Sequence, residues 1–261
     1  YKTDKLNVRS FKIYADGALG SRGAALKESY SDLDNHVGAF ITSKDSLENL
    51  AYKLAASPFQ MNTHAIGDAA NKVVLEAYQK ALVFSEDPRW RVEHAQIIDT
   101  ADLKLFNRKI IPSVQPTHAT SDMYWAEDRL GEDRLLGAYA NKTLLERSGR
   151  IALGTDFPVE EVNPFKTFYA AIARKDSNEF PEEGYLPKNK LSPSEALKGM
   201  TIWGAYANFE DKEKGSIEVG KVADFIILDR DIMRVSEKRI LKSRIVATFL
   251  DGNIVYSNRF N

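Results

Sequence analysis

The feature of this sequence that most constrains its fold is a repeated alternation of short apolar runs with longer amphipathic runs, from about residue 8 to residue 209. Alternation of this kind builds a parallel sheet, because each helix returns the chain to the start of the next strand. We therefore predict an α/β fold. Strands are expected at residues 8–15, 59–64, 89–94, 110–115 and 151–153.

Several of the expected helices begin with a recognisable capping sequence. Asp68 precedes an apolar stripe and is the expected N-cap of its helix. Asn163 combines a capping side chain with Pro164 at the first helical position. Ser192 and Glu195 have the spacing of a capping box, in which each side chain binds the backbone N–H of the other residue.

The character of the sequence changes after about residue 209. Short strands with tight turns are expected there, and Asp251-Gly252 is typical of a two-residue hairpin turn. We predict two domains, a large βα domain over residues 1–209 and a small β-rich segment over residues 210–261. The short strands are expected at residues 215–217, 220–228 and 245–256.

Charge and composition narrow the class of partner. The 36 lysines and arginines nearly balance 37 aspartates and glutamates, for a formal net charge of −1. No global field therefore draws the chain to nucleic acid or to an anionic membrane, and a small-molecule substrate fits better. No apolar run approaches the roughly 20 residues that span a bilayer, so a cytoplasmic protein is expected. Whether the protein forms a homo-oligomer is left open.

The chain contains no cysteine, which excludes disulfides, thiolate zinc sites and cysteine nucleophiles. Any metal must be held by nitrogen and oxygen. Serine hydrolases are also disfavoured, because the sequence has no Gly-x-Ser-x-Gly motif. The glycine-rich stretch of residues 17–23 lacks the pattern of a phosphate-binding loop, and we interpret it as a loop that approaches either a ligand or another segment.

Polar residues stand at the ends of successive expected strands. His64 and His94 each end a strand, His118 follows the next one, and Asp156 follows the last. In barrels of strands and helices, the active site gathers at the carboxyl ends of the strands. Any one histidine alone is more often a hydrogen-bonded loop residue than a ligand, but their repeated position favours a shared site.

These residue types suit a metal-dependent hydrolase. Two histidines and one carboxylate form an open site for a divalent metal, most simply zinc. A bound metal lowers the pKa of water to about 7. Asp156 is the candidate that takes the water proton and passes it on. Lys12 lies on the same strand face as Asp16, and an ion pair with an acid is one explanation for a lysine there.

Six segments together resemble the amidohydrolase superfamily, in the family-three branch that includes N-substituted formamide deformylases. The resemblance implies a partial TIM-type (β/α) barrel, strands four to eight, with a C-terminal segment of a small β-sandwich that begins near residues 220–224. The segments are residues 12–26, 62–71, 91–96, 113–122, 153–164 and 214–228.

The resemblance also assigns roles to residues. Lys12 is implied as a ligand that can be carboxylated and bridge two metal ions, with His64 and His94 as further ligands and Asp156 as ligand and base; one or two ions are expected in the full-length enzyme. Substrate contacts are implied for His118, and we assign Asp16 and Arg22 to the same group. His36 matches no ligand position and is expected to be an ordinary loop residue.

One departure from the family matters. The His-x-His pair of the first barrel strand has no counterpart, since no histidine precedes His36. We therefore expect a fragment whose natural start lies upstream of Tyr1, and we predict that this chain alone is inactive.

The expected activity is hydrolysis of a carbon–nitrogen bond other than a peptide bond, such as an amide or N-formyl group. Deamination or ester hydrolysis by the same ligands is a rival, and so is a catalytically silent relative that binds or regulates.

Overall fold

A computed structural model describes residues 1–258 and shows two compact units. The first consists of Tyr1–Val114 and Ser121–Ile151, and the second of Gln115–Thr120 and Ala152–Asn261. The first unit contains parallel strands alternating with helices, so the predicted α/β class is confirmed.

The sheet of the first unit is built from β1 (Ser10–Tyr14), β2 (Gln60–Ala65), β3 (Trp90–His94) and β4 (Ile110–Val114). Neighbouring strands in this order are parallel, so their carboxyl ends lie at the same edge. Each strand lies within two residues of its predicted bounds at either end.

Strand β2 is buried along its whole length although most of its side chains are polar. Two of its polar side chains form hydrogen bonds with neighbouring elements. The Gln60 amide donates to the Arg89 carbonyl oxygen at 2.5 Å, and the Tyr78 hydroxyl donates to Thr63 Oγ1 at 2.8 Å. A buried polar side chain is tolerated when it is hydrogen-bonded in this way.

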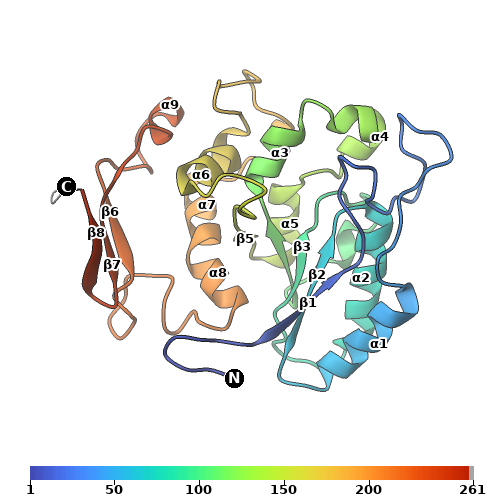
Figure 1. Ribbon diagram of the computed structural model, residues 1–261, viewed down its shortest axis with the longest axis horizontal. Helices are drawn as coiled ribbons and strands as arrows, with labels where there is room; N and C mark the ends of the chain where they lie inside the picture. The colour runs from blue at the N-terminus through green and yellow to red at the C-terminus, as the bar shows by residue number, and fades with distance from the viewer. Residues whose placement is uncertain (259–261) are drawn as a thin grey trace. The chain divides into compact units, whose positions relative to one another are not determined.

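Helices α1 (Lys44–Ala55) and α2 (Asp68–Ala81) pack against each other and against β2 (Figure 1). Ser43 caps α1 by accepting from the Ser46 N–H. The predicted N-cap of α2 is wrong by one residue, because Gly67 occupies that position. Asp68 instead accepts from the N–H groups of Ala69 and Lys27, and thereby joins the helix start to a distant loop.

The remaining helices of the first unit follow β3 and β4. Helix α5 packs against β4 and ends at Gly149, whose φ of 74° gives a left-handed cap. Helix α3 has residues in both units. The bounds are η1 (Leu103–Leu105, a 3₁₀ turn), α3 (Pro116–Asp122), α4 (Ala126–Leu135) and α5 (Asn141–Ser148).

The second unit begins its secondary structure with a short strand and a set of helices, of which α7 packs against β5, α6 and α8. Both predicted caps are confirmed: Asn163 accepts from the Phe165 N–H, and Ser192 with Glu195 forms a complete capping box. The elements are β5 (Ala152–Leu153), α6 (Pro164–Ala173), η2 (Pro187–Asn189, a 3₁₀ turn), α7 (Pro193–Met200) and α8 (Ile202–Ala207).

A three-stranded antiparallel sheet follows, made of β6 (Phe225–Leu228), β7 (Ile245–Leu250) and β8 (Asn253–Ser257), with the short helix α9 (Glu237–Ile240) between the first two strands. The hairpin at Asp251-Gly252 is confirmed, with φ of 50° and 74°. The strand predicted at residues 215–217 is wrong: that stretch forms bends and irregular backbone, and Gly215 has a φ of 91°. The domain boundary near residue 209 stays a prediction.

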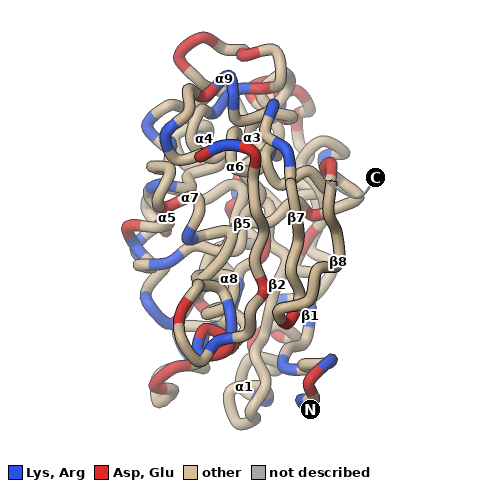
Figure 2. The backbone as a smooth tube through the Cα atoms, turned by 90° about the vertical axis from the view of Figure 1, so that its left-hand side faces the viewer, with Lys and Arg blue, Asp and Glu red and all other residues tan. Residues whose placement is uncertain are grey.

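Charges are mixed along the chain, and Figure 2 shows lysines and arginines interspersed with aspartates and glutamates rather than gathered in one long stretch. Among residues 1–258, no helix combines the length and the apolar content needed to cross a lipid bilayer.

The capping box of α7 provides a test of local stability. We expect Ser192→Ala to lower the free energy of unfolding by about 1 kcal/mol, because the Glu195 N–H loses its acceptor. Ser194→Ala, on the same first turn, is the matched control and should change stability by less than about 0.5 kcal/mol. Urea unfolding followed by circular dichroism measures both, and equal losses would show that the box contributes nothing specific.

Candidate active site

Two histidines meet at the carboxyl edge of the parallel sheet. Strand pairing places Tyr14 opposite His64, and Ala65 opposite His94. The two imidazole rings lie edge to face, with centroids 4.5 Å apart, and both side chains are largely buried. The prediction that His64 and His94 belong to one site is consistent with this contact.

His64 is held by groups from the end of β1 and the loop after it. Its Nε2 lies 3.4 Å from the Gly17 carbonyl oxygen and 3.6 Å from Asp16 Oδ1, and its ring lies 5.1 Å from that of Tyr14. These neighbours limit the rotation of the ring. They leave His64 oriented by the chain before any ligand binds.

Asp16 is fully buried and bonded to the backbone. Its carboxylate accepts from the N–H groups of Ala25, Ile66 and Gly67 at 2.8, 3.0 and 2.8 Å. Burial raises the pKa of Asp16 to about 6, and the three backbone donors oppose that rise. Asp16 therefore joins the loop after β1 to the turn after His64, while its predicted contact with substrate stays a prediction.

Residues 24 and 25, directly after the glycine-rich loop of residues 17–23, approach other backbone closely. A Cβ atom on Gly67 would lie 1.9 Å from the Ala25 carbonyl oxygen, and one on Gly38 would lie 1.9 Å from that of Ala24. Both positions therefore require glycine. Residues 24–25 are therefore packed closely against both Gly38 and Gly67.

Arg22 points its guanidinium at Asp32, with hydrogen bonds of 3.0 and 2.8 Å, and Arg129 pairs with the same carboxylate. This pairing raises the pKa of Arg22. Lys12 is exposed, and its Nζ lies 4.9 Å from the centre of the Tyr14 ring, a cation–π arrangement. Substrate contact by Arg22 and metal bridging by Lys12 both stay predictions.

The second unit holds a separate group of polar residues. His118 is buried in α3, and its Nε2 lies 3.9 Å from Asp156 Oδ2 and 4.0 Å from Glu160 Oε1. Both distances exceed a hydrogen bond. Burial lowers the pKa of His118 to about 4, so its imidazole is neutral at pH 7. Asp156 follows β5 with a φ of 58°, and its side chain is 39% exposed.

Sequence reasoning missed three features of these sites. Glu160 belongs to the same group as His118 and Asp156. The only sequence signal for it is its place in the segment of residues 153–164. The fully buried Asn71 directs its amide nitrogen at the carbonyl oxygens of Ile66 and Ile97, among others, and so ties the turn after His64 to the one after His94. The third feature is a hydrogen-bonded group around Gln96.

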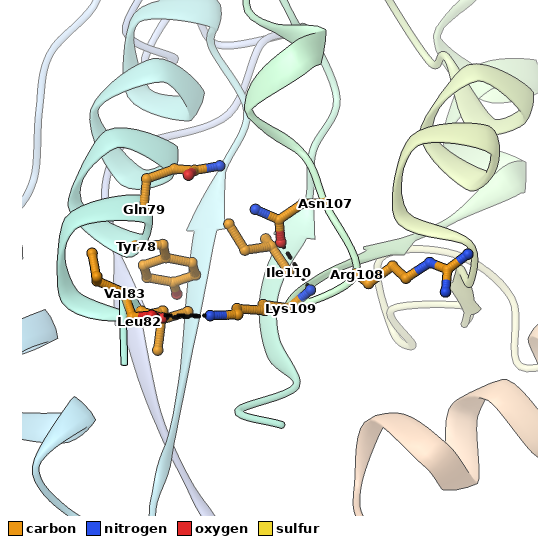
Figure 3. Close-up of a pocket in the computed structure, with 8 residues that line it drawn as sticks. All are labelled: Tyr78, Gln79, Leu82, Val83, Asn107, Arg108, Lys109 and Ile110. Atoms are coloured by element: carbon orange, nitrogen blue, oxygen red, sulfur yellow. Dashed lines mark hydrogen bonds between the residues drawn. The ribbon is translucent and has the colours of Figure 1, made fainter. Parts of the chain in front are cut away.

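The described residues include a cavity of about 420 Å³ in the first unit, but it lies away from the histidines. It is lined by the end of α2 and by the residues that lead into β4, which places it near the amino ends of the strands. In Figure 3 the Lys109 amine points to the Leu82 carbonyl oxygen, a bond of 2.8 Å that closes the end of α2. We therefore do not assign the active site to this cavity.

Comparison with known proteins decides the family. Residues 1–256 match the amidohydrolase family. The chain belongs to this family. Among curated relatives, this chain is 35% identical to the putative amidohydrolase YtcJ of Bacillus subtilis, over 95% of its own length and 47% of that protein. It is 28% identical to the N-substituted formamide deformylase of Arthrobacter pascens, over 95% and 45%. The resemblance to the family-three branch is thus confirmed.

Solved structures agree with the family. An uncharacterized metal-dependent hydrolase from Pyrococcus horikoshii superposes with a TM-score of 0.80 at 29% identity, over 91% of the present chain and 47% of that chain. The chain therefore spans about half the length of the relatives it matches.

The buried neutral state of His118 predicts a pH dependence of stability. In the unfolded chain a histidine takes up its proton below about pH 6.5, whereas folded His118 does so only near pH 4. The stabilisation contributed by neutral His118 is therefore fully present above pH 6.5 and is lost as the pH falls toward 4. Between pH 7 and pH 5 we expect wild type to lose about 2 kcal/mol more unfolding free energy than His118→Gln.

Urea unfolding at the two pH values measures this difference, with His36→Gln as the control that should behave like wild type. An equal loss in wild type and His118→Gln would show that His118 is solvated or paired when protonated.

Proposed function

We propose that this amidohydrolase is part of a metal-dependent hydrolase that acts on carbon–nitrogen bonds other than peptide bonds. The observation that carries the proposal is the edge-to-face contact of His64 and His94 at the carboxyl ends of adjacent parallel strands. Family membership and the deformylase relative support the reaction class. A small-molecule substrate is proposed, in keeping with the net charge of −1.

The finer architecture is part of the same proposal. Strands β1 to β5 correspond to strands four to eight of a TIM-type barrel, and β6 to β8 belong to a small β-sandwich, so the domains divide near residue 209. Supporting this, β1 to β4 are parallel and alternate with helices, whereas β6 to β8 are antiparallel.

The donor set suits a divalent metal such as zinc. With no cysteine in the chain, imidazole nitrogen and carboxylate oxygen are the donors available. His64 and His94 would hold the ion, and carboxylated Lys12 and Asp156 would complete its ligands. Within residues 1–258, no three His, Asp or Glu side chains are already grouped for this purpose. When bound, the metal would supply Lewis acidity and lower the pKa of a water molecule.

The residues of the chain would then divide the remaining work. The Asp156 carboxylate would accept a proton and return it to the leaving nitrogen, a transfer for which its partly exposed position is suited. His118, neutral at pH 7, would donate a hydrogen bond to a substrate oxygen without adding charge. Asp16 and Arg22 would support the substrate side through the loop of residues 17–23.

Metal content tests the proposal. We expect a form extended to the length of its relatives to carry one or two divalent ions per chain and to hydrolyse members of a panel of formamides and amides. The 261-residue chain alone should carry almost none and be inactive. His64→Ala or His94→Ala in the extended form should lose metal and at least about 100-fold in kcat/KM, whereas His36→Gln should keep both.

The outcomes separate the rivals. Turnover of esters or amino-substituted rings instead of amides would assign a different reaction to the same ligands. If the extended form binds no metal even when zinc is supplied, the hydrolytic proposal fails, and a catalytically silent binding protein becomes the better interpretation.

A further inference from the structure

The backbone at the end of β3 adopts an unfavourable conformation. His94 has a φ of 71° and Ala95 a φ of 43°, so two consecutive residues with side chains lie in the left-handed region. This region is unfavourable for a residue with a Cβ atom, and the conformation persists only where surrounding contacts hold it. These two residues form a left-handed turn at the end of β3. The direction in which the His94 ring leaves the sheet depends on that turn, because His94 is its first residue.

A buried hydrogen-bonded group holds the residue that comes next. The Gln96 side-chain amide donates to Asp122 Oδ2 and to the Tyr139 hydroxyl, both at 3.0 Å. The Tyr139 hydroxyl donates in turn to Asp122 Oδ2 at 2.8 Å. Gln96 is 5% exposed and Tyr139 4%, whereas Asp122 is half-buried. The three side chains form a closed ring of donors and acceptors.

The backbone is held at the same place. The Tyr139 N–H donates to the Gln96 carbonyl oxygen at 2.7 Å, and the Ile98 N–H donates to that of Gly137 at 3.0 Å. A Cβ on Gly137 would lie 1.7 Å from the Ile98 carbonyl oxygen, which shows how closely the two segments approach. Gln96 is thus fixed through both its backbone and its side chain.

We infer that Gln96, Asp122 and Tyr139 are positioning residues, which hold the left-handed turn at residues 94–95 and thereby aim the His94 ring at the metal. The inference rests on the proposed function, in which His94 is a ligand. None of the three needs to touch metal or substrate. Asp122 supplies the acceptor, Gln96 the donor, and Tyr139 links the two.

The donor and acceptor roles can be exchanged between two of these residues, which gives a specific test. Gln96→Glu sets a second carboxylate against that of Asp122, and the repulsion opens the ring. Combining it with Asp122→Asn restores one donor and one acceptor at nearly the same volume. Gln79→Glu is the matched control. The Gln79 amide also donates a hydrogen bond, to the Leu105 carbonyl oxygen at 2.6 Å, but Gln79 lies near the C-terminal end of α2.

Two readouts are measured on the form extended to the length of its relatives: the ring ¹H–¹⁵N signals of His94 by NMR without metal, and the dissociation constant for Co²⁺. We expect Gln96→Glu to shift the His94 signals and to weaken Co²⁺ binding about tenfold or more. The double variant should return both toward wild type, and Gln79→Glu should leave both unchanged. Should Gln96→Glu fail to fold, Tyr139→Phe, which removes only a hydroxyl, should give a smaller change in the same direction.

The inference is overturned if Gln96→Glu and Tyr139→Phe leave the His94 signals as in wild type, or if the double variant shows no recovery. Failure of the proposed function looks different: wild type would then bind no Co²⁺, while the NMR comparison would still report whether the ring of donors holds His94.

Discussion

The candidate site depends on the hydrogen bonds that the buried Asp16 carboxylate accepts from three backbone N–H groups. Those groups belong to two separate parts of the chain, the loop after β1 and the turn after β2. Backbone donors in such turns have no partner within a strand or helix, and a buried donor left unsatisfied costs about 1–3 kcal/mol. The Asp16 carboxylate accepts hydrogen bonds from three of these donors. Two of those bonds fix the turn after β2, just after His64.

The same solution recurs at the next strand with different chemistry. Where Asp16 supplies acceptors after β2, the amide nitrogen of Asn71 meets carbonyl oxygens after both β2 and β3. Gln96, Asp122 and Tyr139 then hold the segment after His94. The two histidines therefore stand at or next to the last residue of their paired strands, and side chains hold the irregular backbone that follows each of them.

The sequence predicted strands β1 to β4 and the caps at Asn163 and Ser192, because both follow from local patterns. Apolar periodicity and capping preferences act within a few residues, and a parallel sheet brings strand ends together whatever their separation along the chain. It did not predict that Asp16 would face backbone, that Arg22 would pair with Asp32, or that Glu160 would stand beside His118. Those outcomes depend on which loop folds against which, and no short-range pattern records that.

Gly38 and Gly67 pack closely against residues 24–25, and this packing limits which residues of the region can change independently. Gly38 and Gly67 each face a carbonyl oxygen at a distance that admits no side chain. They lie far apart in the sequence, yet both meet neighbouring residues of one short segment, so neither can be exchanged unless that segment moves away. A side chain at residue 38 or residue 67 could therefore be admitted only together with a shift of residues 24–25, so these three regions can change only in concert.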